Sequence, residues 1–185
     1  MAYFYFDFRD DDKQARSNLL PSLLVQLSNR SDAFFDVLFH LYKTHDNGAR
    51  QPSDKGLTQC LKEMLTLPKQ GPVYLILDAL DECPNTSDVP SPREKVLGLV
   101  EEVVDLGVPS LRICLTSRPE ADILDALQPI ASQTVSLQDH LGQTKDISDY
   151  VRSVIYSDSG KNTKRWREIE KELAIETLSE RAHGT

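Results

Sequence analysis

Cysteine is scarce in this sequence, and long apolar runs are missing. The 185 residues contain three cysteines, Cys60, Cys83 and Cys114, without C-x-x-C spacing, so neither a disulfide framework nor a zinc-binding motif is indicated. We expect Cys60 and Cys114 to be buried on apolar faces, and Cys83, beside an acidic stretch, to be exposed. No segment approaches the roughly 20 apolar residues of a membrane-spanning helix, and the first residues lack a signal-peptide pattern.

Positive charge is scarce as well. The chain has 21 lysines and arginines against 29 aspartates and glutamates, which gives a formal net charge of −8. Nucleic acids and anionic membranes attract basic surfaces, so neither is expected as a partner. Because no membrane segment is predicted and the length suits one hydrophobic core, we expect a cytoplasmic protein.

A glycine-rich phosphate loop is the third missing feature. Such a loop reads G-x-x-x-x-G-K-[ST], because consecutive backbone N–H groups wrap the phosphates while the lysine reaches the β- and γ-oxygens. The Gly-Lys pair at Gly160 and Lys161 has Ile155 at the first glycine position and Asn162 at the hydroxyl position. It lies in a stretch of small polar residues typical of a loop, and we interpret it as a chance match.

The most informative segment that is present reads VYLILDALDE, residues 73–82. Its apolar run predicts a central parallel strand buried on both faces, which ends on Asp78 and is followed within one turn by Asp81 and Glu82. Ligands bind at the carboxyl ends of strands in open α/β sheets, and Mg²⁺ prefers oxygen ligands on a rigid support. The plainer interpretation is a strand followed by a solvated acidic loop.

A second strand-like segment, LRICLTSRPE at residues 111–120, ends in Thr116, Ser117 and Arg118 before Pro119. On a neighbouring parallel strand, this arginine would lie at the same sheet edge as Asp78, where a cation can sense charge on a γ-phosphate. The plainer interpretation is a surface arginine that caps the next helix or pairs with Asp81 or Glu82.

Strand-like and helix-like segments alternate along the chain, which is typical of an α/β fold with a parallel sheet and flanking helices. Helix starts are predicted at Ser53 or Asp54 and at the capping box that begins at Ser91, whereas Pro21 either kinks a leucine-rich helix or marks a late start. A helical tail follows, with one amphipathic helix from Asp146 and another marked by an apolar stripe over 166–178. The predicted strands are 3–8, 73–77, 111–116 and 133–137.

Together, LILDALDE and LTSRPE resemble the Walker B motif and the sensor-arginine strand of the NACHT family of STAND signalling NTPases, in particular its fungal nephrocystin-like group. The resemblance implies that Asp78 binds Mg²⁺ directly or through water. It implies that Asp81 or Glu82 positions or deprotonates the attacking water, and that Arg118 senses the γ-phosphate. Thr116 and Ser117 would line the nucleotide beside it.

The resemblance also implies a P-loop NTPase-like sheet of order 5-1-4-3-2 that lacks its Walker A strand beside 111–116. On this basis, residues 1–140 are expected to form a partial NACHT core that begins after the phosphate-binding helix, and 141–185 the truncated start of the lid region. Mg²⁺ with ATP or GTP is implied for the intact domain of a cytosolic signalling or innate-immunity-like protein. The chain alone is expected to bind no nucleotide. Protein partners or self-association in a STAND-type assembly are implied.

Two alternatives remain open from the sequence. In the first, the chain is a non-catalytic protein-interaction module that has kept the fold and does not use nucleotide. The missing phosphate loop favours this alternative. A metal-dependent hydrolase using Asp78, Asp81 and Glu82 is the other, although no histidine or second carboxylate cluster completes such a site.

Overall fold

The computed structural model describes residues 1–10, 16–136, 141–157 and 166–181. The chain divides into two compact units, Met1–Ser132 and Gln133–Thr185. The first unit contains the sheet and five α-helices among its described residues, and the second contains a pair of helices.

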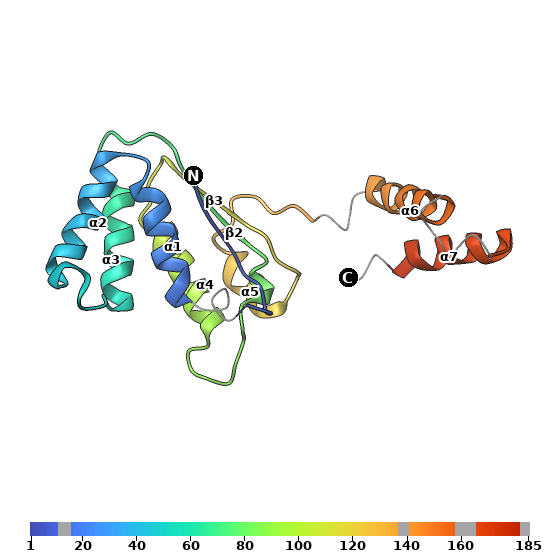
Figure 1. Ribbon diagram of the computed structural model, residues 1–185, viewed down its shortest axis with the longest axis horizontal. Coiled ribbons are helices and arrows are strands. Elements are labelled where there is room, and N and C mark those ends of the chain that lie inside the picture. The colour runs from blue at the N-terminus through green and yellow to red at the C-terminus, as the bar shows by residue number, and fades with distance from the viewer. Residues whose placement is uncertain (11–15, 137–140, 158–165, 182–185) are drawn as a thin grey trace. The chain divides into compact units, whose positions relative to one another are not determined.

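The sheet has three parallel strands in the order β1-β2-β3, as Figure 1 shows. They are β1 (Ala2–Tyr5), β2 (Val73–Asp78) and β3 (Leu111–Leu115). Their aromatic and aliphatic residues favour extended backbone, and helical crossovers allow parallel pairing. The predicted α/β fold with a parallel sheet is therefore confirmed, and three of the four predicted strands are present, although β1 ends at Tyr5 rather than at the predicted Phe8.

Five α-helices and two single 3₁₀ turns complete the described part of the first unit. Ser53 and Ser91 both act as N-caps, accepting N–H bonds at 3.2 Å and 3.1 Å, and the predicted capping box at Ser91 is present. Pro21 lies inside its helix, so it does not mark a late start of that helix. The elements are α1 (Arg16–Ser28), α2 (Asp32–Thr44), η2 (Asp46–Gly48), α3 (Asp54–Thr66), η3 (Leu80–Glu82), α4 (Pro92–Val104) and α5 (Ala121–Leu127).

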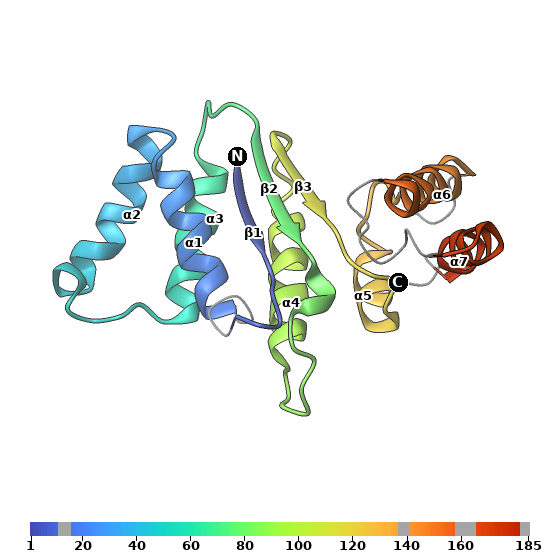
Figure 2. The same ribbon diagram turned by 45° about the vertical axis from the view of Figure 1, so that its right-hand side comes forward.

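Only one face of the sheet is buried. Along β2, Val73, Leu75 and Leu77 are buried, whereas Tyr74 is 48% exposed and Ile76 is half-buried. The prediction that this strand is buried on both faces is therefore wrong. The reason is the one-sided packing of the helices: α1 contacts β1, α3 and α4, which are labelled in Figure 2. Buried apolar side chains of these elements form a single core with the buried face of the sheet.

The same one-sided packing explains two errors about cysteine. Cys114 was predicted to be buried, but it pairs in register with Ile76 on the uncovered face and is exposed. Cys83 was predicted to be exposed, but it follows the buried Leu80 into the core and is buried itself. Cys60, on α3, is buried as predicted.

The outer edge of β1 is bonded to a side chain of α1. The amide of Gln26 accepts the N–H of Tyr3 at 3.0 Å and donates to the carbonyl of Tyr3 at 2.7 Å. The Gln26 amide thus bonds the edge as the backbone of a neighbouring strand would.

The fourth predicted strand is absent from the described part of its range. Residues 133–136 form no strand, and Leu137 lies outside the described residues. Val135 is the one large apolar residue among these four positions and is 60% exposed. The segment therefore buries too little apolar surface to offset the cost of ordering a strand.

The second unit is a helix pair, α6 (Leu141–Tyr156) and α7 (Glu168–Arg181). α6 begins five residues earlier than predicted, and Trp166 precedes α7. Ile155 and Ile175 are buried, and a bidentate pair joins Arg152 to Glu172 at 2.8 Å and 2.9 Å. No helix in the described residues has the length and apolar character needed to cross a bilayer.

Candidate functional site

The carboxyl end of β2 turns sharply into the short helical turn η3. Ala79 takes the left-handed conformation, with φ 54° and ψ 48°, and Leu80 is fully buried behind it. Two hydrogen bonds to Thr116, at the end of the neighbouring strand, fix this turn. The N–H of Ala79 donates to Oγ1 of Thr116 at 3.0 Å, and the N–H of Leu80 donates to the backbone carbonyl of Thr116 at 2.9 Å. Asp78, before this turn, is therefore exposed at the sheet edge, whereas Asp81 and Glu82, after Leu80, are partly buried.

Asp78 and Thr116 meet across the ends of β2 and β3. The Thr116 hydroxyl donates a hydrogen bond to Oδ1 of Asp78, and both side chains are exposed to solvent. Arg118 follows two residues later, so the predicted placement of Asp78 and Arg118 at one edge of the sheet is confirmed.

Asp81 holds Arg118 in place. Its Oδ1 accepts the backbone N–H of Arg118 at 3.0 Å, and its Oδ2 lies 3.4 Å from Nε of the guanidinium. The Asp81 side chain is 9% exposed and that of Arg118 is 71% exposed. The plainer interpretation of Arg118 as a partner of Asp81 is thus observed, and the guanidinium remains largely open to solvent.

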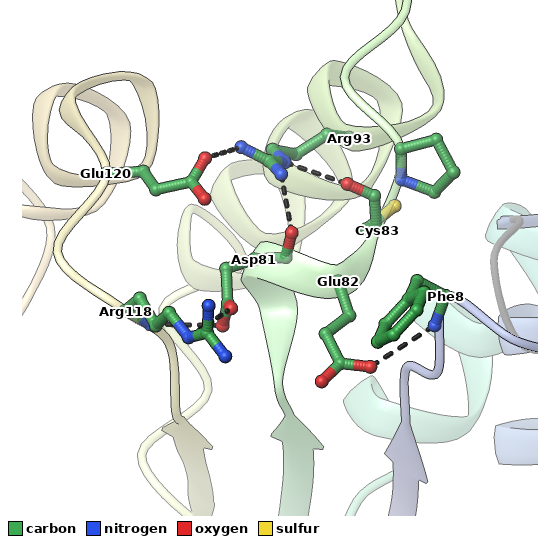
Figure 3. Close-up of a pocket in the computed structure, with 8 residues that line it drawn as sticks. Phe8, Asp81, Glu82, Cys83, Arg93, Arg118 and Glu120 are labelled. Carbon is green, nitrogen blue, oxygen red and sulfur yellow. Dashed lines mark hydrogen bonds and ion pairs between the residues drawn. The ribbon is translucent and has the colours of Figure 1, made fainter. Parts of the chain in front are cut away.

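Glu82 faces the end of β1. Its Oε2 accepts the backbone N–H of Phe8 at 3.2 Å, so the carboxylate lies on the opposite side of the turn from Arg118 (Figure 3). The hydroxyl of Ser117 donates to the carbonyl of Arg118 at 2.8 Å, a bond within its own loop. The described contacts therefore join Asp78 to Thr116 and Asp81 to Arg118, whereas Glu82 bonds to Phe8 and Ser117 to the backbone of its own loop.

A pocket of about 360 Å³ opens beside these groups, and Figure 3 shows the side chains around it. It is lined by Phe8, Asp81, Glu82, Cys83, Pro84, Arg93, Arg118 and Glu120. Burial raises the pKa of the Cys83 thiol to about 11, so this sulfur is protonated near neutral pH.

Arg93 is the site residue that the sequence analysis missed. Arg93 lies within the predicted capping box, but the hydrogen bonds of that motif involve only Ser91 and Glu94. Its guanidinium instead reaches back to the acidic turn and across to the start of α5. An arginine inside an otherwise apolar helix face was the available signal, because a buried guanidinium requires several partners.

The donor set fits a hard cation only in part. Asp78 and Thr116 offer oxygen atoms, the ligand type that Mg²⁺ prefers. Among residues 1–10, 16–136, 141–157 and 166–181, no three His, Cys, Asp or Glu side chains gather as a metal site. A cation at Asp78 would therefore take most of its ligands from water or phosphate, and the metal-dependent hydrolase alternative gains no support.

Comparison with known proteins decides the family. The family model described as Nephrocystin 3, N-terminal matches residues 1–118. The chain belongs to the nephrocystin 3 N-terminal family. The matched region of this nephrocystin-like chain holds all three strands and the acidic turn, and it ends on Arg118. Comparisons with curated proteins and with solved structures found no match.

Proposed function

We propose that this chain carries the magnesium-binding and γ-phosphate-sensing half of a NACHT-type nucleotide site, in a cytoplasmic signalling protein of the fungal STAND class. The observation that supports the proposal is the arrangement of one carboxylate and one cation at the same sheet edge. Asp78 ends β2, Thr116 bonds to it from β3, and the exposed guanidinium of Arg118 follows two residues later.

Each side chain has a distinct task in this proposal. Asp78, oriented by Thr116, would hold Mg²⁺, which when bound neutralises phosphate charge. Arg118 would bind a γ-phosphate oxygen with its solvent-exposed guanidinium face. The Asp81 carboxylate already bonds to Arg118, so its task is to hold that arginine. Glu82 is left as the acid that positions or deprotonates water.

The other half of the site is a phosphate loop, which the sequence of 185 residues does not contain. Most phosphate affinity in such sites comes from backbone N–H groups and the lysine around the β-phosphate. Arg118 alone provides one exposed cation, worth no more than about 1 kcal/mol against a screened partner. We therefore expect the chain by itself to bind neither ATP nor GTP measurably.

Titration calorimetry with Mg-ATP and Mg-GTP tests both parts of the proposal. The chain is compared with a version extended upstream by a phosphate loop, and only the extended protein is expected to bind. Asp78→Ala and Arg118→Ala should weaken that binding. Arg112→Ala, a change at the opposite end of β3, should leave it intact.

Two results would contradict the proposal. Micromolar binding by the short chain that disappears in Asp78→Ala would show that the site is complete without a phosphate loop. Failure of the extended protein to bind either nucleotide would refute the assignment of the edge as a nucleotide site.

A protein-interaction module is the second candidate function, and the uncovered face of the sheet favours it. Tyr3, Tyr5 and Tyr74 are 54%, 44% and 48% exposed on that face, next to Ile76 and Cys114. The partner in this case is a second copy of the chain, consistent with assembly of STAND proteins. Sedimentation at high micromolar concentration should show a dimer that Tyr74→Lys abolishes; a monomer at all concentrations would refute this candidate.

A further inference from the structure

Arg93 carries a charge but is only 5% exposed. It lies in the first turn of α4, and its side chain points away from solvent toward the end of the sheet (Figure 3). A buried guanidinium is costly unless most of its N–H groups are bonded, because the charge has lost its water. The partners of Arg93 therefore identify what this residue holds together.

On one side, Arg93 bonds to the backbone of the acidic turn. Its Nε donates to the carbonyl of Cys83 at 2.9 Å, and its Nη2 donates to the carbonyl of Asp81 at 2.6 Å. These two carbonyls bracket Glu82. The guanidinium thus fixes the backbone that aims both the Asp81 and the Glu82 carboxylates.

On the other side, Arg93 bonds to the start of α5. Its Nη1 donates to Oε2 of Glu120 and lies 3.2 Å from Oδ2 of Asp122, an oxygen that also accepts Nδ2 of Asn85 at 3.1 Å. Glu120 is the N-cap residue of α5, two positions after Arg118. One side chain therefore connects two segments that lie far apart in the sequence.

Arg118 lies between two anchor points. Upstream, Thr116 is bonded to the backbone N–H groups of Ala79 and Leu80; downstream, Glu120 is bonded to Arg93. The short loop between these anchors carries the arginine, and Asp81, itself held by Arg93, receives the Arg118 backbone N–H. Displacement of Arg93 would release both the downstream anchor and the acceptor for Arg118.

We infer that Arg93 is a positioning residue, which sets the location of Arg118 relative to Asp78 by tying the acidic turn to the start of α5. This inference rests on the proposed function for its consequence in nucleotide binding. The tie itself depends only on the contacts given above. Lysine cannot replace Arg93, since a single ammonium cannot reach two carbonyls and two carboxylates in the planar fork of a guanidinium.

Amide hydrogen exchange on this chain tests the tie without nucleotide. In Arg93→Lys, amides of 80–83 and 118–122 should exchange at least about tenfold faster, while those of α2 and α3 keep their rates. Glu120→Gln should accelerate 118–122 and leave 80–83 nearly unchanged. Arg112→Lys is the matched control, because Arg112 also donates to backbone carbonyls, at 2.7 Å and 2.8 Å, and forms no ion pair with a carboxylate of the described residues.

Nucleotide affinity of the phosphate-loop-extended protein separates positioning from simple support of the fold. Arg118→Ala should weaken Mg-nucleotide binding about tenfold in the parent protein and less than about twofold in the Arg93→Lys background. Equal losses in both backgrounds would overturn the inference, as would unchanged exchange at 118–122 or a uniform increase throughout the first unit. If the extended protein binds no nucleotide, the proposed function fails, and the exchange data alone decide whether Arg93 makes the tie.

Discussion

The side-chain hydroxyl of Thr116 donates a hydrogen bond to the carboxylate of Asp78 across adjacent parallel strands. The same hydroxyl oxygen accepts the N–H of Ala79 at 3.0 Å. Thr116 therefore orients the carboxylate and the turn that follows it at the same time, before any ligand is present.

Thr116→Val should destabilise the first unit, because the methyl group that replaces the hydroxyl can neither donate to Asp78 nor accept from Ala79. The expected loss in free energy of unfolding is about 1 kcal/mol, toward the low end for two hydrogen bonds since the site is exposed. Urea unfolding measures it. Thr116→Ser keeps the hydroxyl and should lose less than half as much; equal losses would show that the hydrogen bonds contribute nothing.

Ala79 should tolerate glycine and reject β-branched residues. At φ 54° an L-residue is strained by roughly 1–2 kcal/mol, which glycine avoids at the cost of about 0.5–1 kcal/mol in unfolded-state entropy. Ala79→Gly should thus change the free energy of unfolding only slightly, in the stabilising direction. Ala79→Val should cost more than about 1 kcal/mol, because β-branched residues rarely adopt this conformation. A Val variant as stable as the parent in urea would contradict the assigned backbone.

Thiol reactivity should follow the observed burial of the cysteines. Burial raises the pKa of Cys60 and of Cys83 to about 11, so both remain protonated thiols at neutral pH, whereas Cys114 is exposed on the open sheet face. A chromogenic disulfide reagent at neutral pH should modify one thiol rapidly, and Cys114→Ser should abolish that phase. Rapid modification of Cys83 in the folded chain would refute its burial.

The helix pair of the second unit should be most stable between acid and strongly alkaline pH. The Arg152 hydrogen bond lowers the pKa of Glu172, so its stabilisation is present above the ordinary glutamate pKa and lost as the pH falls through the lowered value. The Glu168 hydrogen bond raises the pKa of Tyr156 to about 12, so that contribution is present below the ordinary tyrosine pKa and lost as the pH rises through about 12.

Methyl NMR signals of Ile155 and Ile175, buried in this pair, report the two transitions during a pH titration. Glu172→Gln should weaken the acid transition, and Tyr156→Phe should remove the alkaline one. Signals that stay constant into the acid range in the parent chain would show that the Arg152 pair adds no stability.

The sequence predicted what depends on local pattern. The strand predicted at 73–77 and found at Val73–Asp78, the cap predicted at Ser53 or Asp54 and the capping box at Ser91 follow from residue order, and so does the sharing of one sheet edge by Asp78 and Arg118. The uncovered face behind Tyr74 was not predictable in this way, because it depends on where distant helices pack rather than on β2 itself.

The same limit applied to the candidate site. Asp78, Asp81, Glu82 and Arg118 were selected because each ends or follows a strand-like run. Arg93 was missed because its importance comes from Glu120, 27 positions further along the chain. Local spacing predicts caps and strand ends, whereas a buried charge is explained only by the partners that the fold brings to it.

The Gln26 amide bonds to both backbone groups of Tyr3 and thereby limits which border of the sheet can accept a further strand. A strand arriving beside β1 would have to displace this side chain, so that border is protected against unwanted pairing with other chains. β3 ends the described sheet at its other border. Any additional strand, from this polypeptide or from another, is thereby directed to the side of the sheet on which Thr116 and Arg118 lie.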